Sequence, residues 1–89
     1  MARINFTPQL QRFTTTPVVE TSASNLRDAL EASFATNPQL RGYVLDEQGH
    51  VRKHVAIFVD GQMLRDRHDL SMNLAASSEI YVLQALSGG

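Results

Sequence analysis

The sequence of 89 residues predicts a single α+β domain in which one main helix lies across one face of a mixed sheet of four to five strands. Three observations predict this class. Strands with alternating apolar residues occur at both ends of the chain, a segment with helical periodicity lies between them, and 43% of the residues are hydrophobic. A chain of this length buries roughly 60 to 65% of its unfolded surface in one modest core. We therefore expect one domain over residues 1–85 and a flexible C-terminal tail over residues 86–89.

The amino-terminal segment is expected to form a hairpin of two strands. Residues 2–6 alternate apolar and polar side chains, which predicts a strand with one buried face. Pro8 ends this strand or confines it to a sheet edge, because proline cannot donate to a ladder of hydrogen bonds. A polar connection follows over residues 7–14, and a second strand centred on two valines returns over residues 15–21.

The main helix is expected to begin after Ser24 or Asn25 and to run to about Thr36. Either residue can accept a hydrogen bond from the first helical turn. If Asn25 is the N-cap, Asp28 occupies the third helical position, where an acid also suits the helix dipole. Residues 37–38, Asn-Pro, end the helix. One stripe at helical spacing faces the sheet, and it consists of Leu26, Ala29, Leu30, Ser33 and Phe34.

Short strands and turns are expected after the helix. Residues 43–45 and Val51 predict a short strand and a hairpin around the turn-rich residues 46–50. Residues 54–59 alternate between two apolar faces and form the strongest predicted strand. The Asp-Gly pair at residues 60–61 predicts a tight turn into another short strand.

The last part of the chain is expected to complete the sheet. Residues 65–78 are predicted to be mostly loop, with one helical turn near residues 70–74, and their mixed charge run is typical of a solvated loop. Residues 79–85 predict the last strand. We expect the first and last strands to be parallel neighbours in the middle of the sheet, so that the tail projects from it.

Composition excludes several classes of function. The chain has no cysteine, which excludes disulfides, thiolate nucleophiles and zinc-thiolate sites. Eight basic and nine acidic residues without a basic block argue against nucleic-acid binding. No apolar run approaches the length of about 18 residues that a membrane helix needs, and residues 1–5 lack the apolar core of a signal peptide. We therefore expect a cytoplasmic protein without a membrane or nucleic-acid partner.

No catalytic or metal-binding constellation is expected within this chain. His50 and His54 are four residues apart in a predicted hairpin, where two surface histidines are more common than a shared metal ion. Serine, histidine and aspartate are present, but no nucleophile elbow indicates a catalytic triad. We therefore assign no catalytic residue and no metal ligand.

The sequence ends with Gly88 and Gly89, preceded by Ser87. Glycine lacks a Cβ, so two in series can pass through a narrow active site and approach a nucleotide closely. A terminal carboxylate has a pKa of roughly 3.3 to 3.7, so it is ionised at neutral pH and must be activated before it reacts. The alternative is a frayed end or a remnant of a tag. We expect the Gly89 carboxylate to be the reacting group.

Apolar residues near the tail form a candidate docking surface. Phe58, Tyr81 and Leu83 are expected on the sheet face opposite the helix, and Leu86 lies just before the glycines. These four residues could anchor the domain on a partner while the tail reaches inward. In the alternative, the segment over residues 61–75 covers Phe58 and Leu83 and completes a small second core.

Two segments resemble the ubiquitin-like sulfur carriers, which have a β-grasp fold. They are His54–Gly61 and the ending Glu79–Gly89. The carriers include the small subunit of molybdopterin synthase (MoaD), the thiamine carrier (ThiS) and the carrier of a thiocarboxylate-dependent cysteine pathway. The resemblance covers nearly the whole chain. It departs at residues 76–78, where many members carry Gly-Asp, and at residues 84–85, where the molybdopterin type often has prolines.

The resemblance implies that this chain is a protein co-substrate rather than an enzyme and binds no cofactor stably. A partner adenylyltransferase of the ubiquitin-activating type would use ATP to convert the Gly89 carboxylate into an acyl-adenylate. Sulfur delivered as a persulfide would then displace AMP, and the resulting thiocarboxylate would donate sulfur to a sulfur-accepting synthase. A metallopeptidase is a further partner in one of the routes. Leu83 matches an apolar docking position of the molybdopterin type.

Two other functions fit the same sequence. A ubiquitin-like protein modifier would transfer the Gly89 acyl group to a lysine of a target protein. A non-catalytic β-grasp interaction module would make no chemical use of its glycines. The acceptor pathway is also open, because carriers of this type serve the synthesis of molybdopterin, thiamine and cysteine.

Overall fold

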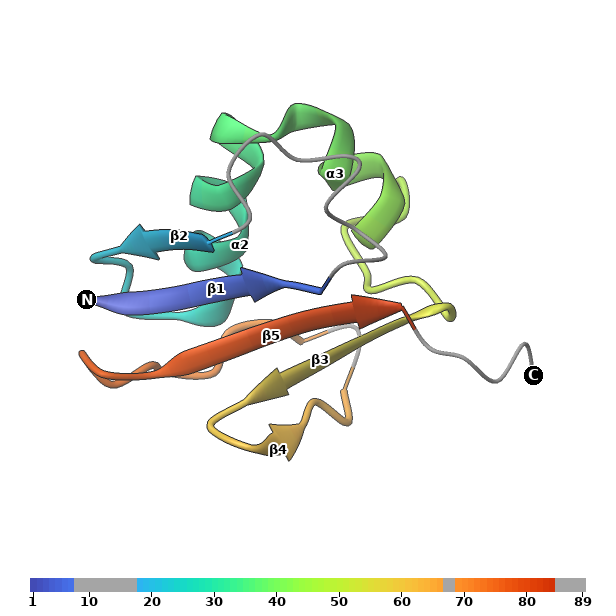
Figure 1. Cartoon of the computed structure of the whole chain (residues 1–89). Helices are drawn as coiled ribbons and strands as arrows, with labels where there is room; N and C mark the ends of the chain where they lie inside the picture. Colours follow the sequence, from blue (N-terminus) through green and yellow to red (C-terminus); the bar gives the residue numbers. More distant parts are fainter. Residues whose placement is uncertain (8–17, 67–68, 85–89) are drawn as a thin grey trace.

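A computed structural model of the chain describes residues 1–7, 18–66 and 69–84, which form one five-stranded mixed sheet with two helices packed on one face (Figure 1). The spatial order of the strands is β2-β1-β5-β3-β4. This arrangement confirms the expected α+β class. The elements are β1 (Ala2–Phe6), β2 (Val18–Thr21), α2 (Leu26–Thr36), α3 (Pro38–Val44), β3 (Val55–Val59), β4 (Gln62–Met63) and β5 (Glu79–Gln84).

The first and last strands lie side by side in the middle of the sheet. β1 pairs with β5 in parallel, with Ile4 opposite Ile80 and Phe6 opposite Val82. β2 pairs with β1 and β3 pairs with β5, both antiparallel. The expected central pairing and amino-terminal hairpin are therefore confirmed. Residues 15–17 of the predicted second strand lie outside the described residues.

The main helix begins where the sequence predicts. Asn25 has extended backbone angles, and its side chain accepts a hydrogen bond of 2.8 Å from the backbone N–H of Asp28. The Asn25 amide also donates to the Asp28 carboxylate at 3.0 Å. All five residues of the predicted stripe are buried. The alternation along the strands supplies the opposite wall of the core, because Ile4, Ile57 and Ile80 are almost fully buried.

The main helix ends at Thr36 as predicted, but the strand predicted at residues 43–45 is wrong, because a second helix, α3, extends to Val44. Pro38 occupies the first turn of α3, where its missing N–H removes no helical hydrogen bond. Leu40 and Val44, four residues apart, are both buried, so the segment has helical periodicity that a strand assignment overlooks. Leu45 alone pairs with Val51, in an isolated antiparallel bridge around the predicted turn.

The expected helical turn near residues 70–74 is also absent. This segment runs extended beside the first turn of α2, where its carbonyls accept the N–H groups that a helix start leaves unpaired. The Leu26 N–H donates to Met72 at 3.0 Å, and the Arg27 N–H donates to Leu70 at 2.8 Å. The segment therefore completes the helix start and inserts the buried Leu70 into the core.

The importance of α3 can be tested at its buried position. Leu40 is fully buried, so Leu40→Ala should lower the free energy of unfolding by about 2 to 5 kcal/mol through lost contacts and a cavity. Denaturant unfolding followed by circular dichroism measures the change. Gln39→Ala, at the exposed neighbouring position of the same helix, should change stability by less than about 0.5 kcal/mol. Equal effects of the two substitutions would contradict the packing of α3.

Candidate functional site

The predicted tail follows directly from the central strand. β5 ends at Gln84, opposite Val55 at the start of β3. Because β1 and β5 are parallel, this end of the sheet lies away from the amino terminus (Figure 1). Four predicted site residues, Leu86, Ser87, Gly88 and Gly89, lie outside the described residues. The described structure ends at Gln84 of β5, and the predicted tail follows this strand in the sequence.

The sheet face opposite the helices carries a row of side chains that crosses all five strands of the described structure. The pairing registers place one residue of each strand in a line across the sheet. In β1, β3 and β5, the residues immediately before and after the aligned residue are buried on the helix side. Cross-strand neighbours on one face lie close enough to form a continuous surface. We call this alignment the outer row, and in spatial order it consists of Val18, Asn5, Tyr81, Phe58 and Met63.

The outer row exposes apolar surface of the kind a partner can cover. Tyr81 is 45% exposed, Val18 44% and Met63 54%, and these are three of the five exposed large apolar residues in the described part of the chain. Phe58 lies half-buried between Tyr81 and Met63. Single exposed apolar residues are ordinary, but an aligned set marks a candidate interaction surface.

Leu83 lies next to the outer row on the same face. It is opposite Ala56, two residues closer to the tail than Tyr81, and it is half-buried. The alternative in which residues 61–75 cover Phe58 and Leu83 does not match the structure. Residues 70–74 of that segment bond to the start of α2, on the other side of the sheet. The structure thus brings Phe58, Tyr81 and Leu83 together on one open face, as the sequence analysis expects.

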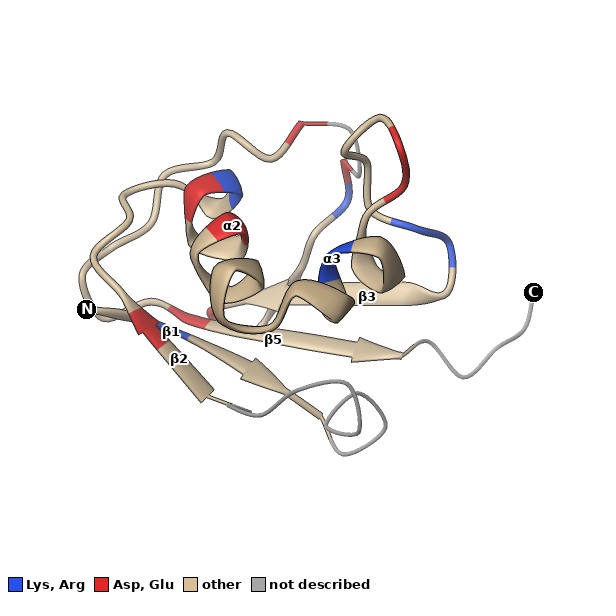
Figure 2. Ribbon diagram, turned by 90° about the horizontal axis from the view of Figure 1, so that it is seen from above, with Lys and Arg blue, Asp and Glu red and all other residues tan. Residues whose placement is uncertain are grey.

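The charges of this face gather at the end away from the tail. The Arg3 guanidinium donates to both carboxylate oxygens of Glu79 at 2.9 and 3.3 Å, and this pairing raises the pKa of Arg3. Glu20 is opposite Arg3 on the other side. Figure 2 shows the coloured segments of β1 and β2 near the amino terminus, while the strands are tan towards the other end. A partner that covers the outer row and Leu83 would therefore desolvate little charge.

The two histidines of the predicted hairpin make separate interactions. The backbone N–H groups of His50 and Gln48 donate to the Asp46 carboxylate, and these bonds lower the pKa of Asp46. The His54 ring meets the Tyr43 ring edge to face, with centroids 4.8 Å apart. Over residues 1–7, 18–66 and 69–84, no group of three or more histidine or acidic side chains is placed to hold a metal ion.

No helix in the described part of the chain is long and apolar enough to cross a membrane. A comparison with protein families identifies the chain, since residues 4–89 match the ThiS family. The chain belongs to the ThiS family. The match includes both the sheet that carries the outer row and the diglycine that follows it. No curated protein shows a sequence match to this chain.

Solved structures show the same fold along the whole chain. Small archaeal modifier protein 1 from Methanosarcina acetivorans is 23% identical, with a TM-score of 0.80 over 99% of this chain and 95% of that one. CysO from Mycobacterium tuberculosis is 18% identical, with a TM-score of 0.82 over 97% and 100%. The Amycolatopsis orientalis BexX/CysO complex gives 13% identity and a TM-score of 0.83 over 100% of both chains. This ThiS-family chain therefore has the ubiquitin-like β-grasp fold.

Two apolar members of the outer row were not predicted from the sequence. Val18 and Met63 lie at the two ends of the row, on the edge strands β2 and β4. The periodicity of each short strand shows which residues share a face but not which strands are neighbours. Only the strand order and register place these residues beside Tyr81 and Phe58.

Proposed function

We propose that this ThiS-family chain is a sulfur carrier whose C-terminal Gly89 carboxylate is adenylated and then converted to a thiocarboxylate. The observation that carries the proposal is the family match, which extends through Gly88 and Gly89 and joins this ending to a β-grasp domain. The thiocarboxylate would donate sulfur in cofactor or amino-acid biosynthesis of the molybdopterin, thiamine or cysteine type. The chain would act as a co-substrate of its partner enzymes.

The chemistry requires nothing from this chain beyond its tail. An adenylyltransferase of the ubiquitin-activating type directs a Gly89 carboxylate oxygen to the α-phosphorus of ATP, and pyrophosphate leaves. A persulfide then attacks the acyl carbon and AMP leaves, after which a thiol reduces the sulfur–sulfur bond and the thiocarboxylate remains. A chain without cysteine can carry sulfur in this way. A sulfur-accepting synthase, and a metallopeptidase where the product remains attached to Gly89, would complete the route.

The geometry supports a division between an anchor and a tail. Residues 85–89, fully extended, span about 17 Å, which suffices to reach from the sheet into an active site. Tyr81 of the outer row and Leu83 lie on the central strand β5, whose last residue, Gln84, precedes that tail. Docking of this face would hold the domain while the glycines enter the partner. Leu86 would extend the contact along the tail.

The tail chemistry can be tested by mass spectrometry. With its cognate adenylyltransferase and ATP, the chain should gain an acyl-adenylate, the mixed anhydride with AMP, at Gly89. A sulfur donor should then exchange one terminal oxygen for sulfur. Deletion of Gly89 should abolish both products, because the remaining end is too short to reach the nucleotide. A wild-type chain that stays unmodified with a partner it demonstrably binds would refute the proposal.

The docking face can be tested by adding a charge. Leu83→Glu and Leu86→Glu should each weaken binding to the adenylyltransferase by about tenfold or more, since a carboxylate would have to be desolvated in the contact. Isothermal titration measures the affinity, and circular dichroism checks the fold. Gln39→Glu, with the same charge on the exposed surface of α3, is the matched control and should bind normally. Normal binding by both leucine variants would contradict the docking face.

The likeness to small archaeal modifier protein 1 favours one alternative, conjugation of Gly89 to lysines of other proteins. Proteome-wide mass spectrometry separates the two functions. A carrier gives a terminal thiocarboxylate, whereas a modifier leaves an isopeptide remnant on its targets. Function in cells that survives deletion of Gly89 would instead favour an interaction module without tail chemistry.

A further inference from the structure

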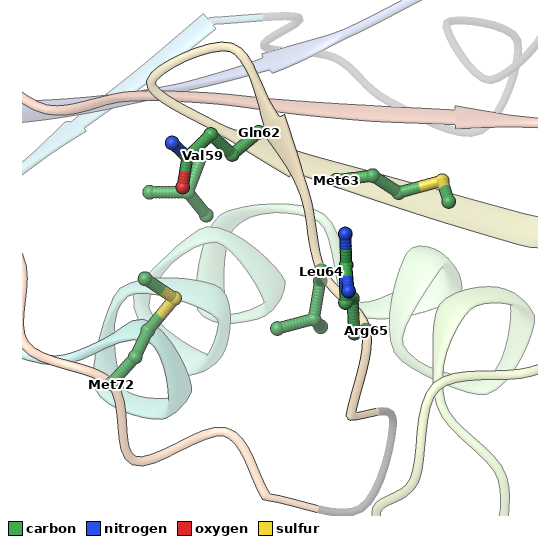
Figure 3. Close-up of a pocket in the computed structure, with 6 residues that line it drawn as sticks. All are labelled: Val59, Gln62, Met63, Leu64, Arg65 and Met72. Atoms are coloured by element: carbon green, nitrogen blue, oxygen red, sulfur yellow. The ribbon is translucent and has the colours of Figure 1, made fainter.

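A groove of about 600 Å³ lies beside the edge strand β4, where the outer row ends at Met63. Figure 3 shows Val59, Leu64 and Met72 pointing into one space between β4 and the segment that contains Met72. Val59 is buried and Leu64 packs against the core, whereas Met72 is 41% exposed. The remaining lining residues are Gln62, Met63 and Arg65. The groove thus has an apolar floor and a rim of flexible side chains, which can adapt to an inserted side chain.

The backbone of β4 presents an unpaired donor and acceptor beside this groove. The Leu64 N–H donates to the Ile57 carbonyl at 2.7 Å, so these two residues form a hydrogen-bonded pair. Antiparallel strands alternate hydrogen-bonded and non-bonded pairs, so Met63, opposite Phe58, belongs to a non-bonded pair. Its N–H and C=O therefore point away from β3. Within the described residues they meet no backbone partner, since β4 is the last strand of the sheet.

A positive charge lies at the rim of the same groove. Arg65 is exposed and belongs to neither of the ion pairs found in the described residues, which join Arg3 to Glu79 and Arg41 to Glu31. The neighbouring Asp66 carboxylate accepts the Asp69 N–H within its own loop. The groove therefore offers apolar volume, a strand edge and a guanidinium, and a carboxylate is the group that best complements the guanidinium.

We infer that this groove binds an extended segment of a partner protein. The segment pairs with the Met63 backbone as an additional strand and inserts an aliphatic side chain between Val59, Leu64 and Met72. It also places a carboxylate against Arg65. Pairing of a peptide with a sheet edge gives affinity through backbone hydrogen bonds and specificity through pockets for alternate side chains. This inference does not depend on the tail or on the sulfur chemistry.

The test titrates the full chain with acetyl-Glu-Ile-Leu-Val-Glu-amide, a synthetic probe, and follows amide NMR signals. The signals of Met63, Leu64 and the segment around Met72 should shift with a common affinity. Arg65→Glu should weaken binding about fivefold or more, and the same peptide with lysines in place of its glutamates should bind that variant better than it binds the wild type. Lys53→Glu makes the same charge change outside the groove and should leave the affinity unchanged.

A second variant tests the strand edge. Met63→Pro removes the outward N–H, a loss that an edge strand tolerates, and it should weaken the peptide more than Met63→Ala, which removes the side chain but keeps the N–H, while the signals of β1, β3 and β5 persist. Three results of the peptide titration would overturn the inference. They are no shifts at millimolar peptide, an affinity indifferent to Arg65→Glu, or shifts confined to the outer row. Concentration-dependent shifts at Met63 without peptide would show that a second copy occupies the edge, and would also overturn it.

Discussion

The parallel pairing of β1 with β5 is the constraint on which the rest of the structure depends. It joins residues 75 or more positions apart, such as Arg3 and Glu79. Closing so long a loop costs conformational entropy, and contacts across the whole core must offset this cost. Ile4 and Ile80 face the same side of this pair and are almost fully buried. The packing of both helices and the positions of both outer strand pairs follow from this central ladder.

The same ladder determines where each kind of surface lies. Side chains alternate along a strand, so burying Ile80 and Val82 against the helices forces Tyr81 and Leu83 onto the opposite face. β5 is central, and its last residue, Gln84, is held by pairing with Val55 of β3, although the ladder with β1 ends at Val82. A tail that begins there starts from a fixed position and direction. For the proposed carrier, only the few residues of the tail would then lose conformational entropy when the tail enters a partner.

The elements that sequence predicted well are those whose periodicity and caps agree. The stripe of α2 and the cap at Asn25 specify a helix and its start without reference to any neighbour. Asn-Pro correctly indicates the end of α2, but the helix at residues 38–44 was missed because proline equally suits the first turn of a new helix. The helical turn predicted near residues 70–74 is wrong because the conformation of this segment depends on hydrogen bonds to N–H groups at the start of α2. The local sequence does not reveal these bonds.

In the candidate site, too, some residues could be predicted from the sequence and others could not. Phe58, Tyr81 and Leu83 could be assigned to one face from alternation within their own strands. The outer row required the register between strands, and the groove beside β4 required knowing which strand is the edge. Both depend on contacts between distant residues, for which a single sequence has no local signal.

Met63 connects the two proposed surfaces. Its side chain ends the outer row, while its backbone forms the open edge beside the groove. A partner that covers the outer row buries the Met63 side chain and limits the space for a strand at that edge. An additional strand at the edge widens the sheet next to Phe58 and Met63. Both surfaces use Met63, so if occupation of one changes the affinity of the other, the reverse change has the same size by the reciprocity of linked binding.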